Sequence, residues 1–177
     1  WTAVWDVLTM KNMAGGGLGC NYPDHRFSGA RRWHHQLVMY GFGLCFAATS
    51  VATIYDHVFD WQAPYAYTSL PVILGTLGGI GLTIGSIGLL WLKGQSDPDV
   101  ADTETTSMDI GFLVLLLMTA VTGLALLAFR ETTSMGILLV IHLGFVLALF
   151  LTLPYGKFVH SIYRFAALIR HAAEGKS

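Results

Sequence analysis

The chain has 177 residues, of which 54% are hydrophobic and 12% are charged, and its mean hydropathy is +0.57. Soluble domains carry about 25% charged residues, so this composition argues against an ordinary soluble domain and predicts a membrane protein. The formal net charge of −1 gives no support to a nucleic-acid partner. Two cysteines, Cys20 and Cys45, are too few for an iron–sulfur or zinc site of their own.

Four apolar segments follow a polar N-terminal stretch. Residues 1–32 are rich in glycine and turn residues. We interpret them as a membrane-proximal connector from an upstream domain, since the chain begins with Trp1 rather than Met. Each apolar segment has about 20 or more residues, enough to cross a bilayer as a helix. The sequence therefore predicts an all-α, integral membrane four-helix bundle in residues 33–177, with spans at about 33–55, 70–92, 110–129 and from 135 past 160.

The basic residues predict the orientation of these spans. An even number of spans places both ends of the chain on one side, and nine of the ten lysine and arginine residues fall on that side. Arg130 alone falls on the other side. By the positive-inside rule we expect both termini to be cytoplasmic, with the four spans in a bacterial inner membrane.

A stripe of glycines runs along the second span. Its members recur at steps of three and four residues and therefore share one face of a helix: Gly75, Gly78, Gly81, Gly85 and Gly88. A face of this kind lets a neighbouring backbone approach closely. Helix packing alone explains the stripe, and so does a flat cofactor lying against it; the pattern leaves both explanations open.

Histidines bracket the first and fourth spans. His142 and His160 are 18 residues apart, about five turns, so they share one azimuth on a continuous helix. His35 and His57 are 22 residues apart and offset by about 40°, whereas His34 would be offset from His57 by about 140°. Because the first and fourth spans run antiparallel, we expect His35 to lie level with His160 on the cytoplasmic side. His57 is expected to lie level with His142 on the outer side.

Two cross-helix histidine pairs are the arrangement that two b-type haems require. A low-spin haem takes two axial nitrogens from facing helices, and ionisable residues inside spans are usually functional. The sequence therefore predicts two haems b between the first and fourth spans, with the iron ligands His35, His57, His142 and His160. A histidine at the end of a span is also a common interfacial anchor, and this alternative stays open for each residue. No acid–base or nucleophile constellation is recognisable, so no catalytic residue is predicted.

Cationic side chains lie beside the predicted ligands. Arg31 and Arg32 precede the first ligand, and Lys157 and Arg164 flank the last one. We predict that these four bind haem propionates, which need cationic partners near the membrane surface. The positive-inside bias explains the same four residues without a haem. Pro154 lies six residues before the last ligand and predicts a kink that re-aims the end of the fourth span.

Five motifs carry a resemblance to a known family: GGGLGCNYPD, ARRWHH, DWQAPY, SLPVILGTLGGIGL and LPYGKFVHSIYRFAALIR. They resemble the cytochrome b-like membrane half of the tricarballylate-utilisation protein B (CitB) family, which includes the C-terminal part of CobZ. The resemblance covers essentially the whole chain. The fourth span is also similar to the haem-bearing helix of respiratory nitrate reductase gamma subunits, with its proline-then-histidine ending.

The resemblance implies an upstream ferredoxin-like half that carries iron–sulfur clusters, followed by a haem-binding membrane half. It implies transfer of electrons from a flavoprotein dehydrogenase, of the tricarballylate dehydrogenase type, to quinone, and it carries the ligand role onto His35, His142 and His160. We therefore expect a membrane-bound electron-transfer subunit of an oxidoreductase complex rather than a catalyst on its own. Two alternatives stay open: a redox subunit of an oxygen-dependent, CobZ-like step in cobalamin biosynthesis, and a non-redox membrane anchor or transporter.

Overall fold

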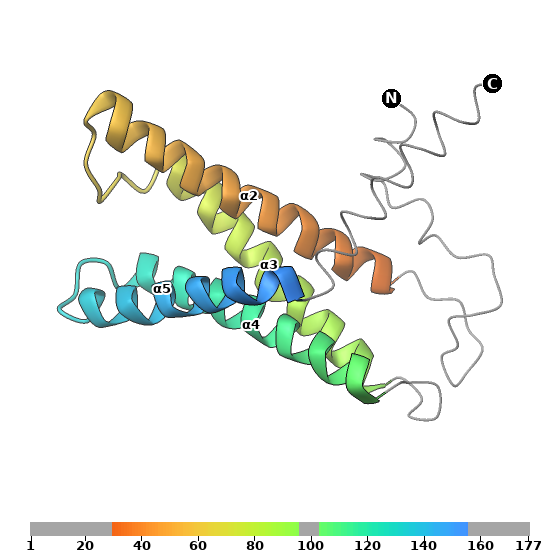
Figure 1. The fold of residues 1–177 in the computed structure, drawn as a ribbon. Helices are drawn as coiled ribbons and strands as arrows, with labels where there is room; N and C mark the ends of the chain where they lie inside the picture. The colour runs from red at the N-terminus through yellow and green to blue at the C-terminus, as the bar shows by residue number, and fades with distance from the viewer. Residues whose placement is uncertain (1–29, 96–102, 156–177) are drawn as a thin grey trace, which may run out of the picture.

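The computed structural model describes residues 30–95 and 103–155, and every regular element in them is helical (Figure 1). The predicted connector at residues 1–32 lies almost wholly outside this part of the chain. The described elements, in chain order, are α2 (Ala30–Phe59), α3 (Leu70–Gly94), α4 (Thr103–Ala128), α5 (Met135–Thr152) and the short 3-10 helix η3 (Leu153–Tyr155).

The four long helices confirm the predicted all-helical architecture. Each is long and apolar enough to cross a membrane, and α2 is the longest with 30 residues. At about 1.5 Å per residue α2 is about 45 Å long, which exceeds the roughly 30 Å hydrocarbon core of a bilayer. The ends of α2 therefore extend beyond the core unless the helix is tilted. Its bounds are wider than the predicted 33–55 because the polar residues at both ends continue the helix.

The fourth span differs from the predicted continuous helix. The α-helix ends at Thr152, and residues 153–155 form a 3-10 turn that contains Pro154. Proline has no backbone N–H and its ring crowds the preceding turn, so an α-helix ends or kinks there. The shared azimuth of His142 and His160 assumes an unbroken helix, which the described residues do not provide. His160 itself lies outside them.

The glycine stripe of α3 is filled by α2. A Cβ atom built on Gly78 would lie 2.8 Å from the backbone nitrogen of Cys45 and 2.8 Å from the carbonyl oxygen of Gly41. One built on Gly41 would lie 2.7 Å from the backbone nitrogen of Leu82. The two backbones therefore touch where the helices cross, as small residues allow in membranes. Of the two explanations for the stripe, helix packing is the one observed.

The helices pack as antiparallel neighbours in chain order, α2 on α3, α3 on α4, and α4 on α5. Figure 1 shows two hairpins, α2–α3 and α4–α5, whose loops lie at the same end of the molecule. Leu82 of α3, Leu116 and Ala120 of α4, and Leu149 of α5 form the buried core. Over the described residues, α2 and α5 are not extensively packed against each other.

Polar contacts join the two hairpins at both ends. At the end where α3 finishes and α4 begins, Lys93 Nζ lies 2.5 Å from Asp109 Oδ2. At the loop end, Arg130 donates from Nη1 to the carbonyl oxygen of Tyr65 at 2.6 Å. The Arg130 guanidinium also lies 3.4 Å from the centroid of the Tyr67 ring. Apolar packing in the middle is thus supplemented by one charged contact at each end.

Candidate functional site

His142 is held between α5 and α4, about two turns inside the loop end of α5. Its Nδ1 atom lies 3.1 Å from the hydroxyl oxygen of Thr122, and its side chain is half-buried. The ring lies against Gly123, where an added Cβ would be 3.0 Å from Cε1 of His142. A glycine at position 123 therefore gives the imidazole room to lie close to the α4 backbone.

His57 has different surroundings. It lies in the last turn of α2, its side chain is 73% exposed, and its Nδ1 atom is 3.2 Å from Asp56 Oδ2. The sequence predicted that His57 and His142 would be level and facing each other. The structure instead places His142 deeper in its helix and against α4, so it does not bring these two predicted ligands together.

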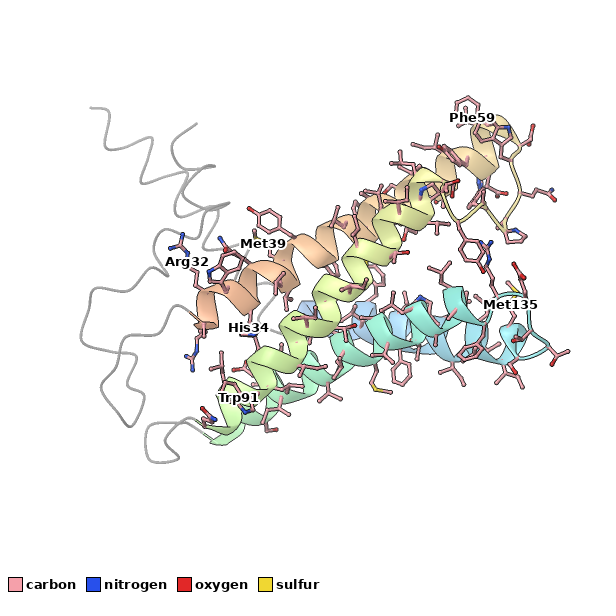
Figure 2. The ribbon with its side chains drawn as sticks, turned by 180° about the vertical axis from the view of Figure 1, so that it is seen from behind. Arg32, His34, Met39, Phe59, Trp91 and Met135 are labelled. Carbon is pink, nitrogen blue, oxygen red and sulfur yellow. The ribbon has the colours of Figure 1, made fainter. Side chains whose placement is uncertain are left out.

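At the other end of α2, His34 rather than His35 packs against a neighbouring helix. His34 is half-buried, and its Nδ1 atom lies 2.7 Å from the carbonyl oxygen of Ala30. A Cβ atom built on Gly88 would overlap the His34 ring, so this imidazole lies directly on the α3 backbone. Figure 2 shows His34 between α2 and α3, at the end marked by Trp91. His35 is exposed.

His34 was not among the predicted ligands, because its azimuth on the helix is offset from that of His57 by about 140°. Its contact instead depends on which helix packs beside α2. The partner is α3, and an antiparallel α2 brings its first turns level with the last turns of α3. The sequence feature that could have indicated this contact is Gly88, the last member of the glycine stripe, because a glycine there leaves space for a bulky ring from α2. Thr122 was also missed, since a threonine inside an apolar span is not distinctive without the register of α4 on α5.

The remaining predicted site residues lie at the start of α2 or outside the described chain. Arg31 is exposed and Arg32 is half-buried, and Figure 2 shows Arg32 at the same end of the bundle as Trp91. His160, Lys157 and Arg164 lie outside the described residues. Within residues 30–95 and 103–155, no three histidine, cysteine or acidic side chains gather as a metal-ion site. A haem iron needs two protein ligands at most, so this finding leaves the haem prediction untested.

Aromatic side chains gather at the loop end. Tyr55 makes edge contacts with Trp61 and Tyr65 at ring-centroid distances of 5.1 and 5.6 Å. The Tyr65 hydroxyl donates to the carbonyl oxygen of Ala52 at 3.1 Å. Burial, with further contributions from the Asp56 carboxylate and from Tyr55, raises the pKa of Tyr65 above its usual range. The aromatic cluster therefore folds the α2–α3 loop back onto the end of α2.

An open apolar pocket of about 300 Å³ lies at the same end, between the α4–α5 loop and the first turns of α5. It is lined by Phe129, Ser134, Ile137 and Leu138. Ser134 supplies the one polar side chain among these four residues. The pocket shares no lining residue with the His142 contacts, so the two features are separate.

Comparison with known proteins places the whole chain in one family. The sequence model of the family described as citrate utilization protein B matches residues 1–177. A curated citrate utilization protein B from Escherichia coli is 54% identical over 170 residues, which cover 96% of this chain and 45% of that protein. This chain thus spans about half the length of that relative. No solved structure matches. The match over the full chain shows that it belongs to the citrate utilization protein B family.

Proposed function

We propose that this chain is the membrane electron-transfer module of a tricarboxylate utilization system. It accepts electrons from a flavoprotein dehydrogenase, through iron–sulfur clusters of the upstream domain that the sequence resemblance implies, and delivers them to quinone. The name of the curated relative supports a role in citrate utilization. The sequence resemblance to tricarballylate-utilisation proteins supports a role with a closely similar tricarboxylate. Four apolar helices support a location in the membrane.

The observation that carries this proposal is the position of His142. An imidazole inside an apolar helix is expensive to bury without a purpose, and this one is half-buried and hydrogen-bonded between two helices. Gly123 removes the side chain that would otherwise crowd the ring. These features fit an axial ligand of a b-type haem, a group that supplies reversible one-electron transfer when bound.

In this proposal the residues of the chain have distinct tasks. His142 would supply one ligand nitrogen to the haem iron, and His57, His35 and His160 are the sequence-based predictions for the other ligands. His57 would have to turn away from Asp56 to take that role. Arg31 and Arg32, at the start of α2, would bind the negatively charged haem propionates near the membrane surface. The apolar helices would exclude water from the surroundings of His142, which is half-buried between α4 and α5.

The distribution of basic residues supports an orientation in a bacterial inner membrane with both termini cytoplasmic. Arg31, Arg32 and Lys93 lie at the end of the bundle away from the hairpin loops, and Arg130 lies at the loop end. This bias matches the positive-inside rule. We therefore assign the loop end to the outer face and the end of Lys93 to the cytoplasmic face.

The visible spectrum of the purified full-length protein tests the proposal. After reduction it should show the α-band of a b-type haem, and His142→Ala should remove part of that band. His171→Ala is the matched control, because His171 lies near the C-terminal end of the sequence, beyond the four predicted ligands, and we expect it to be an ordinary exposed side chain. A wild-type spectrum without a haem band would contradict the redox function and favour the anchor or transporter alternative. An unchanged band in His142→Ala would contradict the ligand assignment.

A further inference from the structure

We propose that Thr122 is a positioning residue, which fixes the tautomer and orientation of His142 so that Nε2 is the nitrogen available to a ligand. The effect on haem binding rests on the proposed function, whereas the choice of tautomer does not. The tautomer itself is a property of the chain. It follows from three contacts around one hydroxyl group.

The hydroxyl proton of Thr122 already has an acceptor. Thr122 Oγ1 lies 2.6 Å from the carbonyl oxygen of Met118, one turn earlier in α4, and 3.2 Å from that of Thr119. A carbonyl oxygen can only accept, so the single hydroxyl proton points toward these two atoms, and the shorter contact takes it. Oγ1 then presents its lone pairs to the third neighbour.

The third neighbour is Nδ1 of His142, at 3.1 Å. Since the threonine has no proton left to donate, Nδ1 must carry the proton of this hydrogen bond. A neutral imidazole has one protonated nitrogen, so Nε2 keeps its lone pair. Metal-ligating histidines use this arrangement, in which a donor bond from the other nitrogen fixes the ring and strengthens the ligand.

The orientation of the ring is fixed by the neighbouring residue. A Cβ atom at Gly123 would lie 3.0 Å from Cε1, 3.5 Å from Nδ1 and 3.7 Å from Nε2 of His142. The ring is therefore confined on one side by the α4 backbone while Thr122 holds one nitrogen. The adjacent residues Thr122 and Gly123 thus fix the position of the His142 imidazole, one by a hydrogen bond and the other by close contact.

His34 provides an internal comparison. Its Nδ1 atom also faces an oxygen that can only accept, the carbonyl of Ala30 at 2.7 Å, so it has the same tautomer. The acceptor belongs to its own helix, however, and its ring lies directly on the α3 backbone at Gly88. A substitution at Thr122 should therefore alter His142 and leave His34 unchanged.

The experiment uses the full-length chain with 15N-labelled histidine, prepared both with and without haem. Nitrogen chemical shifts of the haem-free protein should show His142 protonated at Nδ1. Thr122→Val removes the hydroxyl that accepts from Nδ1 and should raise the fraction of His142 protonated at Nε2, and Thr122→Ser should restore the original pattern. Thr83→Val is the matched control, because Thr83 makes the same hydroxyl-to-carbonyl bond within α3, to Gly79 at 2.8 Å, without a histidine contact.

In the haem-loaded protein, Thr122→Val should lower haem affinity about 10-fold and raise the reduction potential of one haem, because a ligand without its donor bond is less basic. Thr122→Ser should reverse both changes. A wild-type His142 protonated at Nε2, or shifts that Thr122→Val leaves unchanged, would overturn the inference. If the wild-type protein binds no haem but its tautomer depends on Thr122, the positioning role stands and the proposed function fails.

Discussion

The two hairpins are built on different packing principles. In α2–α3 the backbones touch across glycines, and the His34 ring fills the end of the stripe at Gly88. In α4–α5 the helices meet through side chains, and His142 rests on Thr122 and Gly123 with a hydrogen bond between the helices. An interface closed by backbone contact leaves no room for a prosthetic group. His142, whose neighbours on α4 include side chains that can move, belongs to the hairpin α4–α5.

The largest effect is expected where backbone meets backbone. Gly78→Ala should destabilise the protein by about 3 kcal/mol, because the new methyl group meets backbone atoms of Cys45 and Gly41 at 2.8 Å and neither can move alone. Unfolding in mixed detergent and SDS measures this change. Gly43→Ala is the control, since nothing lies within 4 Å of its Cβ position. There the higher helix propensity of alanine should add up to about 1 kcal/mol of stability. Equal effects at both positions would contradict the close-packed α2–α3 interface.

A smaller effect is expected at the loop end, where Arg130 joins the hairpins. Arg130→Ala removes a hydrogen bond to Tyr65 and the stacking on Tyr67, and should cost about 2 kcal/mol of stability in the same assay. Arg130→Lys should recover less than half, because a lysine cannot stack as a planar group. Glu131→Ala is the control, since that side chain is 78% exposed and 3.9 Å from Arg130. An Arg130→Lys variant as stable as the wild type would show that stacking of the guanidinium on Tyr67 does not contribute to stability.

Gly123→Ala tests the contrast between the hairpins directly. Its methyl group meets Cε1 of His142 at 3.0 Å, and the ring can give way by a few tenths of an ångström. The strain and the gain in helix propensity should nearly cancel, so stability should change by no more than about 1 kcal/mol. The 15N shifts of His142 should nevertheless move, which reports the displaced ring. A loss as large as that of Gly78→Ala would show that both hairpins are packed equally tightly.

The smallest effect is expected from the contact of Lys93 with Asp109. Both side chains are about one fifth exposed, and the pair lies at the end of two helices. A double-mutant cycle with Lys93→Met and Asp109→Asn should give a coupling free energy of up to about 1 kcal/mol. A coupling of 3 kcal/mol or more would indicate that this pair, and not apolar packing, holds α3 to α4.

The sequence was sufficient for the architecture because membrane helices are defined by long apolar segments. An apolar helix lies at each of the four predicted spans, although the fourth α-helix ends at Thr152, and α3 and α5 begin at the predicted residues Leu70 and Met135. The glycine stripe of α3 also lies on the face that contacts another helix. These features depend on the apolar composition of each segment and on the spacing of residues along one helix, and both can be read from the sequence.

The pairing of the histidines depends on information that a single helix does not contain. Helical period gave the azimuths of His35 and His57 but not which neighbouring helix each face meets. The contact of the His34 ring with the α3 backbone at Gly88 therefore could not be predicted. The period also assumed a straight fourth helix, whereas the α-helix ends before Pro154. The contact of Thr122 with His142 joins residues 20 apart through the register of α4 on α5. No local pattern encodes that register.

The amount of haem bound per full-length chain tests the central claim most directly. The protein is purified from a haem-replete membrane, and its haem content is measured from the absorbance of the haem–pyridine complex. It should carry two b-type haems per chain. A chain that binds one haem would contradict the arrangement with two ligand pairs. A chain that binds none would contradict the proposal that it transfers electrons from a flavoprotein dehydrogenase to quinone.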